Sequence, residues 1–254
     1  MRIFLCDGIP EGILTGVYDA WASRLGHSQV RLQSGEPGDM ELFAEYTRTR
    51  PDREKAEKVA RTIKRELGAY AWQCIFQAAL SEAPERADSI YRTVVEGLLA
   101  SNKREQIMDR LQNKDIRRVF ELSRRVGNEA HHYLGFLRFS ELGGGILFSK
   151  IHPKARILSL IGDHFSQRFP MEHFLICDAA HEETLLHRAG HPWILTQGQA
   201  LNPERTAQFS ETEQEFRCLW QGFVDTIGIE ERANSGLQRQ LLPLRYRPDL
   251  VEKL

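Results

Sequence analysis

Cysteine is scarce in this chain of 254 residues, and the few cysteines are far apart. The four are Cys6, Cys74, Cys177 and Cys218, and no two of them form a CxxC pair. This spacing argues against a disulfide framework and against a cysteine-based zinc site. It also excludes the three-cysteine cluster motif of a radical-SAM enzyme. We therefore expect four reduced thiols that pack as small apolar side chains.

Long hydrophobic runs are also missing. The longest stretches without a charged residue, 67–81 and 189–203, have 15 residues each. A helix needs about 20 apolar residues to cross a bilayer, so neither stretch is long enough. The opening MRIFLCDG has too few apolar residues before Asp7 for a signal peptide. We expect no contact with a membrane and a cytoplasmic location.

A large excess of one charge is absent as well. The chain has 34 basic and 35 acidic residues, which gives a net charge of −1. This balance excludes a uniformly basic coat for nucleic acid but allows a local basic face. Hydrophobic residues make up 41% of the chain and charged residues 27%, proportions that are typical of a globular protein rather than a disordered one.

Several familiar catalytic and cofactor motifs do not occur. The sequence has no GxxxxGK[ST] phosphate loop, no GxGxxG, no HExxH and no GxSxG. Eight of the nine histidines lie between residues 131 and 191, but they are scattered over several expected strands and helices. From these patterns we expect no metal ion and no cofactor.

The hydrophobic pattern predicts a mostly helical N-terminal half. Residues 2–6 and 30–33 read as strands, with a helix from about residue 10 to 25 between them. Further helices are expected over 49–67, with Thr49 as its cap, and over 69–80, 86–100 and 114–137. Ser81 to Pro84 interrupts this series, and we place a domain boundary there.

The second half changes to strand patterns. Strands are expected at 137–142 and 146–151 around a glycine hairpin, and at 173–178, 184–187 and 193–196. A short helix at 157–169, a capping box at 210–213 that opens a helix, and a last helix at 231–241 complete the pattern. The prediction is an α+β fold: a helical N-terminal half with one short N-terminal strand, then a mainly antiparallel sheet of about five strands packed against long helices. We expect domains over 1–84 and 85–254.

One side of the expected helix 114–137 carries a polar group at the edge of its apolar stripe. Arg125, Glu129 and His132 are spaced i, i+4 and i+7, so they share that side. A carboxylate at the edge of a core needs a partner, because burying it alone costs several kcal/mol. Glu129 is therefore either a functional carboxylate in a cleft or half of an ordinary ion pair with Arg125.

Other polar residues are candidates for the same cleft. Asp178 ends an expected strand next to a polar turn, a position that suits a functional carboxylate and also an ordinary turn residue. The cleft is predicted to consist of Glu129, His131, His132, Arg138, His164, Arg168 and Asp178. If the chain is a catalyst, the candidates for its acid or base are Glu129, His131 and Asp178.

The C-terminal segment 232–248 carries four arginines and no acidic residue. Arginine binds phosphate through paired hydrogen bonds, and Asn and Gln can bond to sugar, phosphate or base edges. The alternative is that these arginines pair with acids of their own fold or stay solvated. The residues predicted to contact DNA phosphates are Arg232, Asn234, Gln238, Arg245 and Arg247.

Four sequence blocks, in order, resemble a known bacterial family. They read DGxxEGxLTxVxxAW at 7–21, ExHxxxGFxRFxEL at 129–142, HFxxRFPxExFxIxD at 164–178, and LWxxFxxTIxIxxRxNxxLQxxxxPxRYR at 219–247. Together they resemble the "probable DNA metabolism protein" family. Its members are typically encoded beside a putative DNA modification/repair radical-SAM protein. A domain like residues 85–254 also occurs fused to uracil-DNA glycosylase-like domains.

The resemblance implies DNA repair or modification by association, and it carries over no catalytic residue. One departure is that His181 stands where the family pattern has an arginine, three residues after Asp178. The leading hypothesis is a DNA-binding or adaptor partner of a radical-SAM DNA repair or modification enzyme. The alternative is a hydrolase or a nucleobase- or nucleotide-processing enzyme that acts on DNA through a Glu/Asp–His cleft. The sequence leaves the oligomeric state open.

Overall fold

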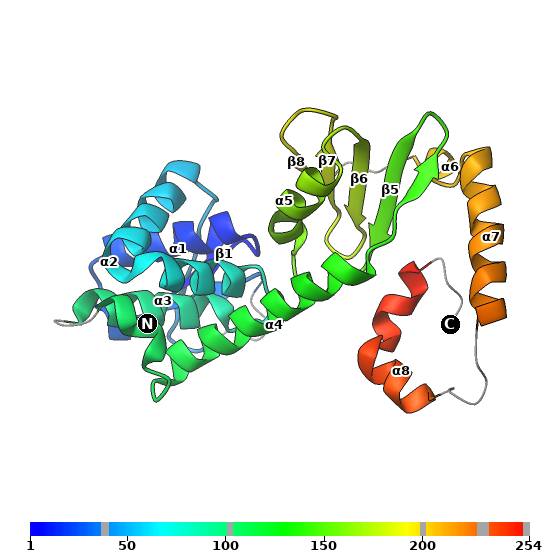
Figure 1. Cartoon of the computed structure of the whole chain (residues 1–254). Helices are drawn as coiled ribbons and strands as arrows, with labels where there is room; N and C mark the ends of the chain where they lie inside the picture. The colour runs from blue at the N-terminus through cyan, green and yellow to red at the C-terminus, as the bar shows by residue number, and fades with distance from the viewer. Residues whose placement is uncertain (37–40, 101–103, 199–201, 228–233, 251–254) are drawn as a thin grey trace. The chain divides into compact units, whose positions relative to one another are not determined.

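The computed structural model describes residues 1–36, 41–100, 104–198, 202–227 and 234–250 (Figure 1). Its contacts divide the chain into two compact units, Met1–Asn128 (unit 1) and Glu129–Leu254 (unit 2). The predicted α+β class is confirmed: helices dominate, with a short N-terminal strand and a later five-stranded sheet. The predicted domains over 1–84 and 85–254 stay a prediction.

Unit 1 contains a three-stranded parallel sheet. β1 (Arg2–Cys6) lies in the middle, with β2 (Val30–Ser34) on one side and β3 (Glu45–Arg48) on the other. β1 and β2 agree with the predicted strands. β3 was not expected, because its residues EYTR are polar and partly exposed and show no apolar alternation.

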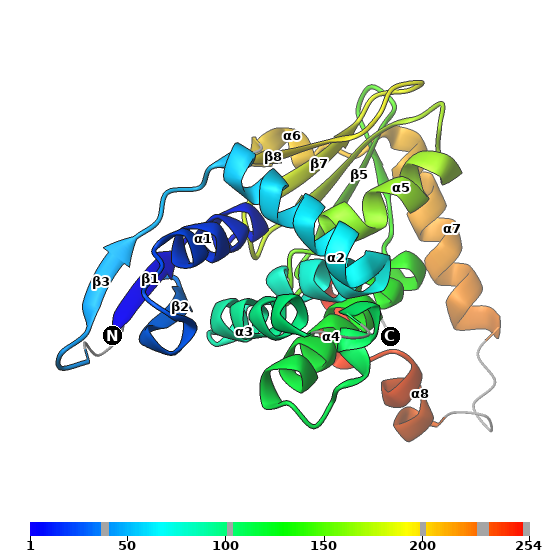
Figure 2. The ribbon, with the colours of Figure 1, turned by 90° about the vertical axis from the view of Figure 1, so that its left-hand side faces the viewer.

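Helices cover this sheet and supply most of the core of unit 1. α1 follows β1 directly and lies beside α2, as Figures 1 and 2 both show. The fully buried side chains of this core include Ile13, Ile63, Ile75 and Tyr91. The helical segments are α1 (Pro10–Ala22), η1 (His27–Gln29), α2 (Arg53–Ala79), α3 (Arg86–Leu99), η2 (Arg104–Asp109) and the first part of α4 (Lys114–Phe136).

α2 is two helices that meet at a glycine, as the sequence predicted. Gly68 has φ 87° and ψ 169°, a backbone conformation that only glycine adopts without strain. The start of α2 differs from the prediction. Its cap is Asp52, whose side chain accepts a hydrogen bond from the amide of Lys55, whereas the Thr49 hydroxyl donates to the carbonyl of Leu5 at 3.0 Å.

Gly68→Ala should destabilise unit 1 by about 1–3 kcal/mol, since alanine is strained at this φ and ψ. The matched control is Gly127→Ala in α4. That glycine is helical, and a new Cβ would meet only Gln77 at ordinary van der Waals distance, so this variant should gain up to about 1 kcal/mol. Urea unfolding of both variants checks the prediction, and equal midpoints would contradict it.

Unit 2 is built on a five-stranded sheet with the order β4-β5-β6-β7-β8. Three of its four strand pairs are antiparallel, which confirms the predicted mainly antiparallel sheet. The exception is β5 with β6, a parallel pair whose connection contains α5. The strands are β4 (Ser140–Leu142), β5 (Ile146–Ile151), β6 (His173–Asp178), β7 (Glu183–His187) and β8 (Ile194–Gln197).

The helices of unit 2 follow the end of α4. α5 packs so closely on the sheet that a Cβ at Gly162 would clash with Trp193 and Leu185. α7 begins as the capping box predicted, with the amide of Glu213 donating to the Ser210 hydroxyl at 3.0 Å. The segments are α5 (Leu158–Arg168), α6 (Pro203–Thr206), α7 (Glu211–Ile227), α8 (Ser235–Leu241) and η4 (Leu244–Asp249).

All four cysteines are free thiols, and two of them are buried. Burial raises the pKa of the Cys6 thiol to about 12 and also raises the pKa of Cys74 and Cys177, so these thiols stay protonated near neutral pH. Across the described ranges, no helix combines the length and the apolar character that a membrane span needs.

Candidate nucleic-acid interface

Tyr246 anchors the C-terminal segment of unit 2 to the end of α4. Its ring is 1% exposed and packs edge-on against Tyr133 and His132 and at a tilt against Phe136. Its hydroxyl accepts a hydrogen bond from Arg245 and lies 3.1 Å from Nδ1 of His132. The hydroxyl group therefore joins the C-terminal segment to α4 through a polar contact as well as through the ring.

Glu129 lies next to this anchor and is 5% exposed. Its two carboxylate oxygens accept hydrogen bonds from the consecutive amides of Lys154 and Ala155, at 3.0 and 3.1 Å. Arg245 forms an ion pair with the same carboxylate at 3.4 Å. The predicted need for a partner is met by two backbone amides and by an arginine 116 positions further along the chain.

A basic pocket of about 410 Å³ opens on the β4–β5 side of unit 2. Four of its lining residues are basic, and none of the lining residues in the described part of the chain is acidic. Phe148 and Phe209 contribute aromatic rings, and the buried residues Ser140 and Ser149 add hydroxyl groups. The lining residues are Arg138, Ser140, Phe148, Ser149, Lys150, His152, Phe209, Arg217, Pro248 and Leu250.

Arg217 is held rigidly in this pocket. It donates to Glu213 at 2.7 Å and to the Ser140 hydroxyl at 2.5 Å, and its guanidinium lies 4.0 Å from the centre of the Phe209 ring. Glu213 also accepts from the amide of Glu141, which ties α7 to β4. Because these three contacts already fix the guanidinium, it loses little conformational entropy when it binds an anion.

The C-terminal segment borders the same pocket. Pro248 and Leu250 line it, directly after the two arginines of η4. Arg245 remains about two-fifths exposed despite its contacts with Glu129 and Tyr246. Arg247 is half-buried and donates to the carbonyl of Leu242 at 3.4 Å.

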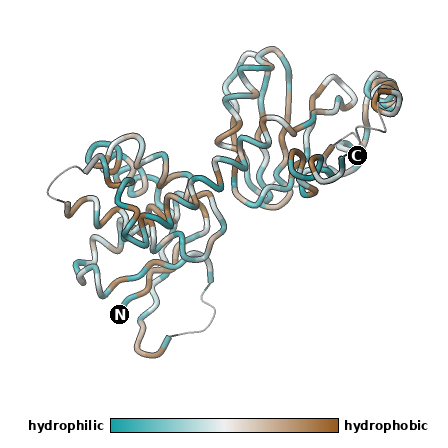
Figure 3. Tube along the Cα trace, turned by 60° about the horizontal axis from the view of Figure 1, so that its bottom comes forward, coloured by the Kyte–Doolittle hydropathy of each residue, from teal (hydrophilic) through white to brown (hydrophobic). Residues whose placement is uncertain are grey.

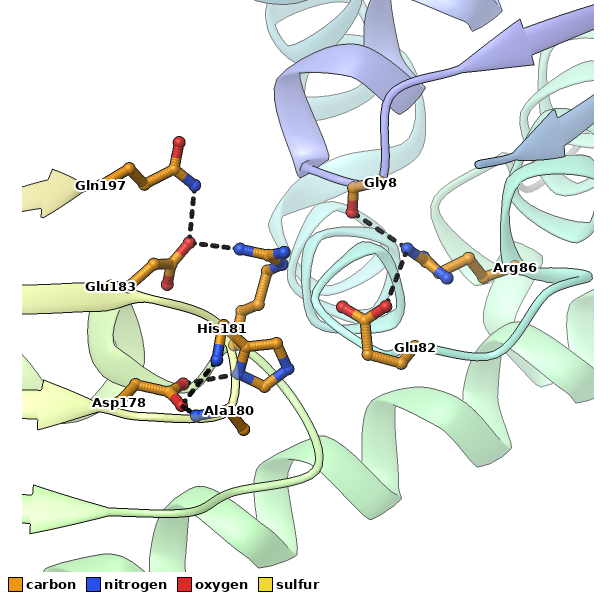
Figure 4. A network of polar contacts seen from close by, with 9 residues as sticks. Gly8, Glu82, Arg86, Asp178, Ala180, His181, Glu183 and Gln197 are labelled. Carbon is orange, nitrogen blue, oxygen red and sulfur yellow. Dashed lines mark hydrogen bonds and ion pairs between the residues drawn. The ribbon is translucent and has the colours of Figure 1, made fainter. Parts of the chain in front are cut away.

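Asp178 lies in a separate polar network at the end of β6 (Figure 4). It is fully buried, and its Oδ1 accepts from the amides of Ala180 and His181 while Oδ2 lies 2.6 Å from Nδ1 of His181. The paired residue Glu183 starts β7 and accepts from Arg156 at 2.7 Å and from Gln197 at 2.9 Å. The network closes the β6–β7 turn.

The remaining predicted cleft residues are dispersed over unit 2. His131 is exposed on α4, and His164 and Arg168 are exposed on α5, where each contacts a phenylalanine ring next to it in sequence. Arg138 donates to the carbonyl of Gly135 at 2.8 Å and lines the basic pocket. The clearest groupings are therefore Glu129 with His132, and Arg138 with the pocket.

The predicted phosphate contacts fall into two parts. Arg245 and Arg247 lie in η4 beside the pocket, as described above. Asn234 caps α8 by accepting from the amide of Leu237, and Gln238 is exposed on the same helix. Arg232 lies outside the described residues.

Sequence reasoning missed Lys150, His152 and Arg217. Phe148 and Lys150 are two positions apart in β5 and so share one face of the sheet, and His152 directly follows the strand; this spacing could have identified Lys150 and His152. Arg217 gave no comparable pattern, because its pocket neighbours Ser140 and Phe209 come from other elements. Among the residues that the structure describes, no cluster of three His, Cys, Asp or Glu side chains could hold a metal ion.

One protein family matches the part of the chain that contains the candidate interface. Residues 84–252 match the family described as a domain of unknown function, DUF4130. The chain belongs to the DUF4130 family. The match includes unit 2 up to residue 252, and with it the basic pocket and the Tyr246 anchor, together with α3 and α4. No curated protein matches the sequence.

Proposed function

We propose that this DUF4130 protein binds DNA through the basic pocket of unit 2 and acts as an adaptor for a radical-SAM DNA repair or modification enzyme. The observation that carries the DNA contact is the pocket's composition: Arg138, Lys150, His152 and Arg217 share a hollow with two phenylalanine rings. Cationic groups bind phosphates, and aromatic rings stack on bases that are out of the helix.

The size and charge of the pocket favour a nucleotide as its occupant. Its volume of about 410 Å³ lies in the range of small-molecule sites. Glu213 pairs with Arg217 at 2.7 Å and accepts from the amide of Glu141, while Lys150 and Arg138 bring further positive charge to the pocket. Arg245 and Arg247 extend this positive charge along the C-terminal segment, where phosphates of a longer strand would lie.

The adaptor role is supported by α7. Its apolar residues recur at helical spacing on one stripe and are exposed, and the tube of α7 in Figure 3 shows hydrophobic and hydrophilic residues in turn. Exposed apolar side chains that adjoin one another on a surface are typical of protein–protein contacts. The stripe consists of Phe216, Leu219, Trp220, Phe223 and Ile227. The radical-SAM partner itself follows from the family resemblance.

The DNA contact predicts a salt-dependent affinity that Lys150→Gln weakens. We expect fluorescence anisotropy with a single-stranded oligonucleotide to show a falling log affinity against log salt concentration. Loss of one phosphate contact should lower the slope by about one unit and the affinity by about three- to tenfold at low salt.

The matched control is Arg188→Gln, an exposed arginine of unit 2 that does not line the pocket. It should leave both slope and affinity close to those of the original chain. A flat salt response of the unmodified chain, or equal losses in the two variants, would remove the DNA-contact proposal.

The adaptor role has its own test. Phe223→Ser on α7 should reduce recovery of the radical-SAM protein encoded beside the gene in co-purification, since it removes an exposed apolar side chain from the stripe. Gln221→Ser, on the same helix, is the control. Equal recovery with both variants would contradict the use of this stripe.

The alternative function, a hydrolase or nucleobase-processing enzyme, is supported by one observation. Asp178 and His181 form a buried carboxylate–imidazole pair at 2.6 Å, the arrangement that orients a histidine as a general base. In that case His181→Gln should abolish turnover of a DNA substrate while the salt-dependent affinity stays unchanged. A turnover that survives this substitution would exclude the pair as the catalytic base.

A further inference from the structure

A second crevice lies in unit 1 and contains no residue of the candidate interface in unit 2. It has a volume of about 330 Å³ and lies where the three parallel strands end. Each strand contributes the residues at or just after its last position, so the crevice follows the carboxyl edge of the sheet. The lining residues are Leu5, Cys6, Asp7, Gly8, Gly35, Glu36, Arg48, Thr49, Arg50 and Pro51.

The strand order places this crevice at a topological switch point. From β1 the chain passes through α1 to β2 on one side, and it then crosses to β3 on the other side of β1. In open parallel sheets, the connections on the two sides of such a strand leave a crevice outside its carboxyl end, and ligands bind there.

Two glycines of α1 let the helix backbone approach the end of β1 closely. A Cβ at Gly12 would lie 2.7 Å from Cβ of Asp7 and 2.8 Å from its carbonyl oxygen, so only glycine fits in this first turn of α1. A Cβ at Gly16 would clash with Sγ of Cys6, so the helix lies directly on its strand. Glycines with these two roles, close approach and helix–strand packing, also shape nucleotide-binding turns of other parallel sheets.

A buried arginine holds the turn between β1 and α1 in place. Arg86 is 3% exposed, and it donates to the carbonyl of Gly8 at 3.0 Å (Figure 4). It also donates to the carbonyl of Ala83 at 2.9 Å. Glu82 lies 3.5 Å from the same guanidinium. The loop between β1 and α1 is thus positioned before any ligand arrives.

The charged side chains of the crevice are mixed in sign. Arg48 and Arg50 lie at the end of β3, while Asp7 follows β1 and Glu36 follows β2. Glu36 accepts from Arg48 at 2.6 Å, and both side chains are exposed. An acidic residue just beyond the second strand is suited to accept hydrogen bonds from sugar hydroxyls, and an arginine across the crevice is suited to a phosphate.

We propose that this crevice binds a nucleoside 5′-phosphate, with the sugar at Glu36 and the phosphate between Arg50 and the start of α1. A bare anion is a poor match, because two carboxylates share the site. A neutral nucleoside would leave Arg50 without its counter-charge. The same chemistry is offered by a free mononucleotide and by the 5′-phosphate end of a nucleic acid strand.

Titration calorimetry of the full chain tests the proposal with AMP, ATP, inorganic phosphate, and one oligonucleotide with and without a 5′-phosphate. Arg50→Gln should weaken nucleotide binding about tenfold or more, since it removes a charge-assisted contact. Arg53→Gln, an exposed arginine in the first turn of α2, is the matched control and should change affinity less than about twofold. Glu36→Gln should weaken AMP and leave inorganic phosphate unchanged, and Glu41→Gln is its control.

The outcomes separate the sources of the ligand. Arg50-dependent binding of AMP or ATP alone indicates a free nucleotide, and Arg50-dependent binding that extends to the 5′-phosphorylated strand indicates a strand end. No binding of any nucleotide at millimolar concentration, equal losses in Arg50→Gln and Arg53→Gln, or binding of inorganic phosphate as tight as that of AMP would overturn the proposal. Lys150→Gln reports on the basic pocket of unit 2, so nucleotide binding that is lost in Arg50→Gln and kept in Lys150→Gln belongs to the crevice. Nucleotide binding that is lost in Lys150→Gln and kept in Arg50→Gln belongs to the basic pocket and overturns the proposal, so failure here and failure of the DNA contact can be told apart.

Discussion

Replacing Tyr246 by alanine should release the C-terminal segment of unit 2 and lower its stability by about 3–5 kcal/mol. The ring is almost completely buried and contacts three aromatic rings of α4, and truncation of a buried aromatic side chain typically costs this much. The substitution also removes the hydroxyl group that Arg245 and His132 share. Since Pro248 and Leu250 line the basic pocket, the variant should also bind DNA more weakly.

Tyr246→Phe is the matched control, because it keeps the ring and removes only the hydroxyl group. We expect a loss of about 1 kcal/mol from the missing hydrogen bonds. Urea unfolding measures the stabilities, and the rate of tryptic cleavage after Arg245 reports release of the segment. Unchanged cleavage and stability in Tyr246→Ala would show that the anchor does not hold the segment.

Asp178→Ala should destabilise unit 2 by about 3–4 kcal/mol. The carboxylate is fully buried and accepts from two backbone amides, and each amide left without a partner costs about 1–3 kcal/mol. The variant also leaves the buried imidazole of His181 without its carboxylate. Thermal unfolding, followed by near-ultraviolet circular dichroism, measures the effect.

Two further variants test whether the loss of stability is specific to the buried carboxylate of Asp178. Asp178→Asn keeps an oxygen for the two amides and should cost less than half as much as Asp178→Ala. Asp163→Ala removes an exposed carboxylate that accepts from Trp193 at 2.7 Å, and it should cost about 1 kcal/mol or less. Equal losses at Asp163 and Asp178 would mean that the buried network contributes nothing special to stability.

Much of the fold could be predicted, because the decisive patterns are local. The five strands of unit 2 alternate or carry apolar runs, and α4 has one continuous apolar stripe. The break at Gly68 was predicted from the two helical patterns on either side of it. β3 was missed because an exposed edge strand needs no apolar face, and its parallel pairing with β1 depends on distant residues.

The candidate site was predicted only in part, because its contacts join distant positions. Glu129 was singled out correctly as a carboxylate that needs a partner, but its partners, the amides of Lys154 and Ala155 and the side chain of Arg245, are fixed by tertiary packing. Helical spacing offered Arg125 instead, since spacing reveals only neighbours on one helix. The basic pocket combines side chains from β4, β5 and α7 for the same reason.

The proposed DNA contact depends on the basic pocket and the C-terminal segment acting on one strand of DNA. Photo-crosslinking with an oligonucleotide that contains 5-bromouracil, followed by mass spectrometry, tests this directly. We predict crosslinks in the peptides that contain Phe148 and Phe209, fewer of them at high salt, and a loss of them in Tyr246→Ala. Crosslinks that avoid both peptides, or that persist unchanged in high salt, would contradict the proposal.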